Sequence, residues 1–340
     1  MKNLKLYGAL FLALFAGVTF TACDDDDDNG ISGVTPSATP SPALTDVNGN
    51  KVLLTSAGNT RFEYDDNGKL TGVYTPEQDF VVDPKDFSLS FKYDDGDAIV
   101  SYKISIALNA DGLISKARLD HTEDYDYYGK ETRQIYLEYS YNNLRQVTSA
   151  KGSAKGEYVE DGERETMSAD MSQKYTWTDG NLTKTVTSEK GSYRYGGEKD
   201  SYTFEDITTF TYGDLDNPVR QFPVCMSIST YSFGILNMVG LFGVGPAQLP
   251  VHCKSQTTET WDDDYYYDDD YSYTSEYSPS FVMNDNGTIA EEWWDRYTYI
   301  PYGYSTTRAE LSEGNVKELL ETLKNLPFAR HRRVRHHLAR

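Results

Sequence analysis

Two clusters of acidic residues hold the side chains best suited to binding a metal ion. The first runs from Asp262 to Asp270 and the second from Asp124 to Tyr128. Carboxylates at alternate positions offer the oxygen ligands that Ca²⁺ prefers, so Ca²⁺ is the one cofactor that the sequence suggests. The candidate ligands lie in the first cluster and are Asp262, Asp264, Asp268 and Asp270. Neither cluster has the glycine and distal glutamate of an EF-hand loop, and a solvated acidic loop is the simpler interpretation.

Cys23 is the residue best placed for covalent modification by a lipid. Residues 1–22 contain Lys2 and Lys5, then a short apolar run, then the small residues Thr21 and Ala22. This order is typical of a secretory signal peptide. The cysteine directly after it resembles a bacterial lipoprotein cleavage site, which would make Cys23 the lipidated first residue of the mature chain. A secretory signal followed by an incidental cysteine is the alternative.

Cys225 and Cys253 are the two thiols that remain. An exported chain meets an oxidising compartment, where a disulfide between them would form and persist. The two positions are 28 residues apart, and closing a loop of that length contributes about 3 kcal/mol in the loop-entropy model. Two buried free thiols are the alternative that the sequence leaves open.

Trp293 and Trp294 are the candidate ligand contacts. They are adjacent, so in a strand one ring faces the core and the other faces solvent. An outward ring can stack on a sugar or a peptide side chain. The chain has 28 tyrosines and only four tryptophans, and ordinary packing of aromatic strand residues is the competing interpretation.

No established catalytic motif is present in the sequence. Neither His121 nor His252 has zinc-ligand spacing, and there is no nucleophile elbow, phosphate loop or dinucleotide fingerprint. The abundance of carboxylates leaves a glycosidase-type carboxylate pair open. The formal net charge of −21 argues against nucleic acid as a partner and against electrostatic adsorption to anionic membranes. We therefore expect a binding protein rather than an enzyme.

A repeated hairpin must position all of these residues. Its type sequence is FEYDDNGKL at Phe62 to Leu70, in which alternating apolar residues lead into a turn with Asn67-Gly68. Full-length copies lie at Ile106 to Ile114 and Phe281 to Ile289, shorter copies at Leu137 to Leu144 and Tyr175 to Leu182, and a degenerate copy at Phe210 to Asp214. We expect the glycine of each full-length copy, in Asn67-Gly68, Asp111-Gly112 and Asn286-Gly287, to have a positive φ at a hairpin tip.

The repeat indicates an all-β protein. Residues 48–310 are predicted to form one antiparallel meander of about 12–16 strands, in a curled or barrel-like sheet. The mean hydropathy of −0.61 and the polar faces of the strands disfavour an integral outer-membrane barrel. The apolar stretch Gly234 to Pro250 is predicted to form a short buried helix that plugs one end of the sheet and is ended by Pro246 and Pro250, with an apolar ligand-binding loop as the alternative.

The ends of the chain differ from the β domain. Residues 23–47, which include the run Asp24 to Asp28, are predicted to be an acidic and Pro/Ser-rich disordered tether. Residues 311–328 follow a helical pattern, and residues 329–340 form a basic tail. That tail is expected either to bind the acidic domain or lipid phosphates, or to be an unselected extension.

These features together resemble a family. The cleavage box at Cys23, the acidic run, the FEYDDNGKL-type hairpins and the LFGVGPAQLP stretch are similar to Bacteroidota lipoproteins that carry a domain of unknown function with a porin-like fold. The resemblance covers roughly residues 50 to 305. It implies a curled, many-stranded antiparallel sheet and supplies no catalytic residues. An acidic run after the lipidated cysteine resembles a surface-export signal in such bacteria, although in other bacteria it resembles inner-membrane retention. The hairpin is also similar to the repeats of toxin-encapsulating shells.

Three functions are consistent with the sequence. The first is a surface-displayed, lipid-anchored binding module for a glycan or a peptide, which requires an exposed aromatic patch or a groove on the sheet. The second is an envelope-assembly lipoprotein that docks a partner protein through an exposed segment 234–250. The third is a hydrolase with two carboxylates in a cleft. In each case we expect a monomer held at the outer membrane by its lipid.

Overall fold

The computed structural model describes residues 44–75, 79–83, 88–94, 98–125, 129–160, 163–195, 198–226, 233–262, 271–296 and 298–305. The strands are β1 (Leu44–Thr45), β2 (Lys51–Ala57), β3 (Thr60–Tyr64), β4 (Leu70–Tyr74), β5 (Asp79–Asp83), β6 (Ser88–Asp94), β7 (Ala98–Leu108), β8 (Ile114–Tyr125), β9 (Gly129–Tyr141), β10 (Val147–Glu160), β11 (Glu163–Thr178), β12 (Asn181–Tyr195), β13 (Glu198–Asp216), β14 (Gln248–Asp262), β15 (Tyr271–Tyr277), β16 (Ser280–Met283), β17 (Ile289–Trp293) and β18 (Tyr299–Ser305). The helix that the described residues contain is α2 (Gly234–Met238).

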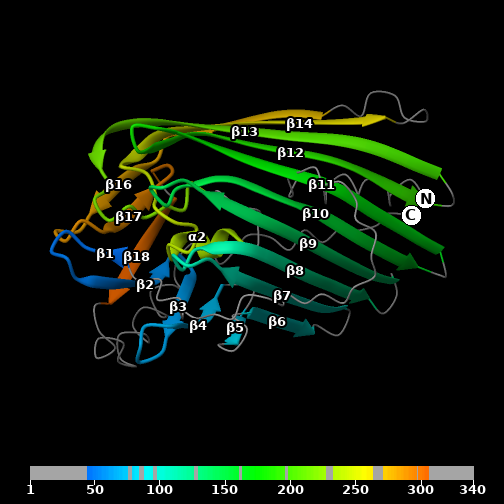
Figure 1. Ribbon diagram of the computed structural model, residues 1–340, viewed down its shortest axis with the longest axis horizontal. Helices are drawn as coiled ribbons and strands as arrows, with labels where there is room; N and C mark the ends of the chain where they lie inside the picture. The colour runs from blue at the N-terminus through cyan, green and yellow to red at the C-terminus, as the bar shows by residue number, and fades with distance from the viewer. Residues whose placement is uncertain are drawn as a thin grey trace.

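The strands form a curled antiparallel meander, as the sequence predicts. From β2 to β15 each strand pairs with the next, while β16 pairs with β17, β17 with β18, and β18 returns to β2. Long strands lie side by side along one part of the molecule, and the short strands gather near α2 (Figure 1). No closed barrel is found among the described strands.

The described strands number 18, which is more than the predicted 12–16. One reason is β1, which has two residues and is too short to carry an alternating pattern. The second is that Ser278 and Pro279 separate β15 from β16, where the sequence pattern runs on with little interruption. Proline cannot donate to a strand ladder, and it therefore divides what would otherwise be one strand.

Five turns share a hydrogen-bonding pattern that begins at an aspartate or asparagine. In the type hairpin, Oδ1 of Asp65 accepts from the backbone nitrogens of Asn67 at 2.8 Å and Lys69 at 2.9 Å, and the Gly68 nitrogen donates to the Asp65 carbonyl at 3.0 Å. The same backbone bonds start at Asp46, Asn109, Asn142 and Asn284. At Asp46, Asp65, Asn109 and Asn142 the side-chain oxygen of the first turn residue thus satisfies backbone donors that the hairpin leaves open.

The glycines of the three full-length hairpin copies have the predicted positive φ. The values are 75° at Gly68, 76° at Gly112 and 81° at Gly287, which confirms these tips. The shorter copy at Leu137 to Leu144 is misplaced: the turn bonds start at Asn142, Leu144 lies exposed in the turn instead of beginning the next strand, and Arg145, just beyond the copy, has the positive φ of 61°. Its guanidinium donates to the carbonyl of Asp111 at 2.9 Å, so this arginine links two neighbouring turns.

The degenerate copy at Phe210 to Asp214 does not form a hairpin. These residues lie inside β13, and the chain turns later, where the Arg220 nitrogen donates to the Asn217 carbonyl at 3.0 Å. The copy at 210–214 has no turn aspartate or asparagine three residues before its glycine, which explains why it continues as a strand. Asn217 supplies that residue, and Arg220 takes the positive φ of 55°.

The apolar stretch after β13 is buried, as predicted, although its helix is only five residues long. Leu236, Val239, Leu241 and Phe242 are enclosed in the core. We call residues 233–247 the plug segment. Its backbone bonds to the turn ends of several strands, through Leu241 to Ile114, Val244 to Arg145 and Ala247 to Gly180.

The prolines do not end the helix, which corrects the sequence-based prediction. The helix ends at Met238, and Gly240 then adopts a φ of 79°. Pro246 lies eight residues beyond the helix, and Pro250 lies within β14. A glycine in the left-handed region after a helix is a common stop signal, and here it acts before either proline.

Several predictions fall outside the described residues. These are the signal peptide 1–22, Cys23, the acidic run Asp24 to Asp28, the C-terminal helix 311–328 and the tail 329–340. The C-terminal helix therefore has no support from the structure. In the part of the chain that is described, no helix has both the length and the apolar character needed to cross a membrane.

Candidate binding groove

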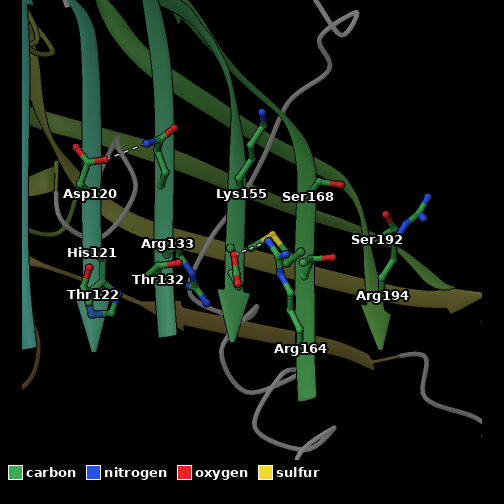
Figure 2. Close-up of a pocket in the computed structure, with 15 residues that line it drawn as sticks. Asp120, His121, Thr122, Thr132, Arg133, Lys155, Arg164, Ser168, Ser192 and Arg194 are labelled. Carbon is green, nitrogen blue, oxygen red and sulfur yellow. Dashed lines mark hydrogen bonds and ion pairs between the residues drawn. The ribbon is translucent and has the colours of Figure 1, made fainter. Parts of the chain in front are cut away.

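A shallow groove of about 460 Å³ lies across β8, β9, β10, β11 and β12 (Figure 2). These strands are paired neighbours in that order. Two cross-strand rows of side chains line the groove on the solvent side of the sheet. The first row is Asp120, Gln134, Lys155, Ser168 and Ser192, and the second is Thr122, Thr132, Glu157, Thr166 and Arg194.

The strand period explains why these residues share one face. Successive residues of a strand point to opposite faces, so positions two apart fall on the same side. The residues between the two rows, among them His121 and Arg133, turn their side chains to the core face and are buried. The serines and threonines of the two rows have small side chains, and the groove is the space that they leave beside the longer side chains.

The two carboxylates of the groove already have partners. Oδ1 of Asp120 accepts from Nη2 of Arg118 at 2.8 Å and from Nε2 of Gln134 at 3.0 Å. Oε2 of Glu157 accepts from Nη2 of Arg164 at 2.8 Å. Their negative charges are thus largely compensated by the neighbouring arginines Arg118 and Arg164.

Two cations of the groove are exposed and have no such compensation. Lys155 and Arg194 make no ion pair with any residue that the structure describes, and both side chains are solvent-exposed. In a chain with a net charge of −21, this is a local site of positive charge. With hydroxyl and amide groups beside it, the groove can bind an anionic group and several hydroxyl groups of one ligand.

A charged network lies on the core face behind the groove. Nε2 of His121 is 3.0 Å from Oε1 of Glu123, and Nη2 of Arg133 is 3.0 Å from Oε1 of Glu131. Glu123 and Glu131 are directly opposite one another in the ladder between β8 and β9. The Tyr102 ring stacks on His121 with centroids 4.2 Å apart, and this stacking fixes the imidazole.

The two opposed carboxyl groups have their pKa values shifted in opposite directions. Burial raises the pKa of Glu131, and the Arg133 guanidinium offsets only part of that rise. Burial acts the same way on Glu123, but hydrogen bonds from His121 and Tyr125 outweigh it and hold the pKa of Glu123 below its ordinary value. The two neighbouring carboxyl groups therefore differ in how readily they ionise, because different side chains donate hydrogen bonds to them.

Trp294 is the more exposed of the two predicted aromatic contacts. Trp293 ends β17, is half-buried and stacks on Tyr299 with centroids 4.7 Å apart. Trp294 follows the strand, is 38% exposed and stacks on Tyr277. The structure does not bring either ring to the groove of Figure 2, since neither lines it.

Glu292 is an interior residue that the sequence analysis missed. Its side chain is fully buried and accepts four hydrogen bonds, from the nitrogens of Val224 and Cys225, from Tyr302 Oη and from Trp294 Nε1. The four distances lie between 2.6 and 2.8 Å. This carboxylate joins β17 and β18 to the turn that contains Cys225.

The local signal for such pairs is a glutamate two residues before a tryptophan. Trp261 donates to Glu259 at 2.8 Å, and Trp293 donates to Glu291 at 2.8 Å, in the same way as Trp294 to Glu292. Residues two apart in a strand share a face, so this spacing places an indole N–H beside a carboxylate. The E-x-W spacing is visible in the sequence, although the burial of Glu292 is not.

The two cysteines of the β domain come together in the structure. Cys225 and Cys253 are both buried and are neighbours in the fold, since Tyr277 bonds to the Cys225 carbonyl and is the ladder partner of Cys253. Both are free thiols here. The disulfide between Cys225 and Cys253 stays a prediction, and the structure brings its two predicted partners together.

The acidic cluster at 262–270 falls almost entirely outside the described residues. Asp262 is the last residue of β14, while Asp264, Asp268 and Asp270 are not described. Among the residues that are described, no three His, Cys, Asp or Glu side chains are grouped to hold a metal ion.

The fold and groove define an antiparallel β-meander protein with a polar, partly cationic surface site. No protein-family model and no curated protein sequence matches the chain. Two similar solved structures are a porin-like protein from Bacteroides vulgatus ATCC 8482 and one from Bacteroides uniformis ATCC 8492. The first has 12% identity and a TM-score of 0.37, covering 74% of this chain and 98% of that chain. The second has 10% identity and a TM-score of 0.35, covering 77% of this chain and 95% of that chain.

Proposed function

We propose that this protein is a lipid-anchored envelope protein that binds an acidic glycan in the groove across β8 to β12. The observation that carries the proposal is the pair of exposed, uncompensated cations Lys155 and Arg194 among rows of hydroxyl groups. A uronic acid or sulfated sugar offers the matching chemistry, because it combines a fixed anion with many hydroxyl groups.

A peptide ligand fits the groove less well. Peptide recognition uses pockets for apolar or aromatic side chains, or a strand edge that accepts backbone hydrogen bonds. The groove has no exposed apolar anchor among its described lining residues, since Met167 is buried. It also lies in the middle of five paired strands rather than at an edge.

The two other functions have less support. Docking of a partner through residues 234–250 requires that this stretch be exposed, whereas Leu236, Leu241 and Phe242 are buried. Hydrolysis in the groove requires an available acid and base, whereas Asp120 and Glu157 are both engaged in ion pairs. The anchoring of the protein by Cys23 is part of the proposal and rests on the sequence.

The test is a binding titration of the full chain in detergent. The probes are a uronic-acid homopolymer, a sulfated glycan and a neutral glucan, and the variant is Lys155→Glu/Arg194→Glu. We expect binding of at least one acidic glycan, weaker binding at higher salt, and a loss of affinity of about tenfold or more in the variant. The neutral glucan should not bind.

The matched control is Lys151→Glu/Lys190→Glu. These lysines are exposed, lie four residues before Lys155 and Arg194 on the same strands, and do not line the groove. The control changes net charge by the same amount and should retain affinity. Equal losses of affinity in both variants would show that the effect comes from overall charge. Failure of both acidic glycans to bind would overturn the proposed ligand class.

A further inference from the structure

The two buried cysteines lie on different parts of the fold and face one another. Cys253 is in β14, opposite Phe210 of β13 on one side and Tyr277 of β15 on the other. Cys225 is in the turn between β13 and α2. The Cys253 thiol is close enough to that of Cys225 to raise its pKa, and neither side chain is open to solvent.

Hydrogen bonds that do not involve sulfur fix the place of Cys225. Its nitrogen donates to Oε1 of Glu292 at 2.7 Å, and its carbonyl accepts from Oη of Tyr277 at 2.6 Å. Tyr277 is also the ladder partner of Cys253. The same tyrosine therefore positions both cysteines, and the two sulfur atoms are brought together without a bond between them.

We propose that Cys225 and Cys253 form a disulfide bond in the exported protein and that this bond clamps the plug segment to the sheet. Each thiol gives up its proton and one electron, and the two sulfur atoms join. The acceptor is a second disulfide, which is reduced to two thiols by exchange through a mixed intermediate. The oxidising side of the cell envelope supplies acceptors of this class.

The bond closes a loop that contains α2 and the whole plug segment. That segment reaches the turn ends at Ile114, Arg145 and Gly180 through single backbone hydrogen bonds. A covalent link at Cys225 and Cys253 holds both ends of the segment to β14. When the backbone hydrogen bonds of the plug segment break, the disulfide would still hold its two ends near the sheet. The bond therefore limits how far the segment can move in a local opening.

Burial also determines when the bond forms. It raises the pKa of the Cys225 thiol, and the neighbouring Cys253 and Glu292 act in the same direction. The thiolate is the form that attacks a disulfide, so it is scarce once the site has closed. We expect oxidation to occur while the chain folds and the formed bond to resist reductants afterwards.

The test is mass spectrometry on the full chain purified from cell envelopes without reductant. The protein is unfolded in the presence of an alkylating agent and digested. We expect a peptide pair linked through Cys225 and Cys253, with neither residue alkylated. After reduction both should be alkylated, and the melting temperature should fall by about 5–10 °C. Complete alkylation of both cysteines before reduction would overturn the proposal.

A second measurement uses Cys225→Ala/Cys253→Ala. This variant should melt near the temperature of the reduced wild type and should not respond to reductant. If the variant does not fold, the oxidation rate of the wild type still decides the matter. Chains refolding with oxidised glutathione should form the bond at least tenfold faster than folded, reduced protein does. Equal rates would show that the folded site is open and would contradict the proposed order of events.

Discussion

Trp294 donates from its indole Nε1 to Oε1 of Glu292 at 2.6 Å, which connects a partly exposed ring to a fully buried carboxylate. Trp293, one residue earlier, donates in the same way to Glu291, whose side chain is only partly buried. The two neighbouring tryptophans therefore make the same bond in environments of different polarity. A hydrogen bond to a carboxylate contributes more when that carboxylate is removed from water.

Trp294→Phe should destabilise the protein more than Trp293→Phe. Phenylalanine keeps a ring to stack on Tyr277 or Tyr299 but loses the N–H donor. Because Glu292 retains three other donors, we expect Trp294→Phe to lower the free energy of unfolding by about 1–2 kcal/mol. The loss in Trp293→Phe should be less than half of this. Urea unfolding of both variants measures the difference, and equal losses would show that the burial of Glu292 adds nothing to the bond.

The recurring turns could be read from the sequence because their signal is local. Asn-Gly and Asp-Gly pairs flanked by alternating apolar residues identify the tips at Gly68, Gly112 and Gly287, and all three have the expected φ. The turn at Asn217 was missed because a proline and an arginine stand where the other copies have a turn residue and a glycine. Its asparagine at the first position was the available signal.

The groove could not be read from the sequence because it depends on register across five strands. Lys155 and Arg194 are 39 positions apart, and nothing in their neighbourhoods distinguishes them from other strand cations. A shift of one residue in any pairing would send a whole row to the core face. The buried Glu292 was hidden for a similar reason, since two of its four donors come from a turn almost 70 residues earlier in the chain.

Gly112→Ala should cost about 1–2 kcal/mol, because an L-residue with a Cβ is disfavoured in the left-handed region. Gly112 has a φ of 76°, and a Cβ added there meets no atom within 4 Å, so the cost is conformational alone. Gly156→Ala is the control. Gly156 lies inside β10, and an added Cβ would meet its nearest atom at an ordinary 3.5 Å.

The control should be neutral or slightly stabilising, since glycine inside a strand is unfavourable relative to alanine. Thermal or urea unfolding of the two variants provides the comparison. If Gly112→Ala unfolds at the same denaturant concentration as the wild type, positive φ is not required at the hairpin tips and the repeat has a different basis.

Glu123 and Glu131 should affect the pH dependence of stability in opposite ways. The pKa of Glu123 is lowered in the folded state, so its stabilisation is present above the ordinary value of 4.5 and is lost as the pH falls through the folded value. The pKa of Glu131 is raised by burial. The contribution of Glu131 to stability is therefore present below pH 4.5 and is lost as the pH rises through the pKa that Glu131 has in the folded state.

Two glutamine variants test this difference at pH 7. Glu123→Gln loses charge-assisted bonds from His121 and Tyr125 and should lower the free energy of unfolding by about 2 kcal/mol. Glu131→Gln removes a carboxylate whose ionised form is disfavoured, so it should be neutral or stabilising, and more so at pH 7 than at pH 4. Urea unfolding at several pH values gives the profile. If Glu131→Gln lowered the free energy of unfolding as much as Glu123→Gln does, the predicted difference between the two glutamates would be contradicted.

Cys23→Ala should abolish lipid attachment. The prediction rests on the order of charged, apolar and small residues before Cys23. Metabolic labelling with a fatty acid should mark the wild type and leave the variant unlabelled, and the variant should leave the membrane fraction. Cys225→Ala is the control, because it removes a buried thiol of the β domain and should not change labelling. Labelling that persists in Cys23→Ala would exclude this residue as the lipidation site.

Replacing Asp24 to Asp28 with asparagine should keep the lipid but confine the protein to the periplasmic side of the outer membrane. The five acidic residues directly follow the anchor, where an export signal would be read. Beyond them, an extended chain spans at most about 3.3–3.6 Å per residue, so the stretch before β1 can separate the groove from the membrane by several tens of ångströms. Display outside the cell would give the groove access to polysaccharides too large to enter the periplasm.

Protease treatment and antibody labelling of intact cells distinguish the two locations. Wild-type protein should be cleaved and labelled, whereas the asparagine variant should be reached only after the outer membrane is opened. A serine replacement within residues 29–43 that keeps the five aspartates is the control and should remain at the surface. If the wild type is protected in intact cells, the acidic run is only a spacer. The groove would then have to bind a smaller, periplasmic acidic glycan, and the choice of ligand in the binding titration would change accordingly.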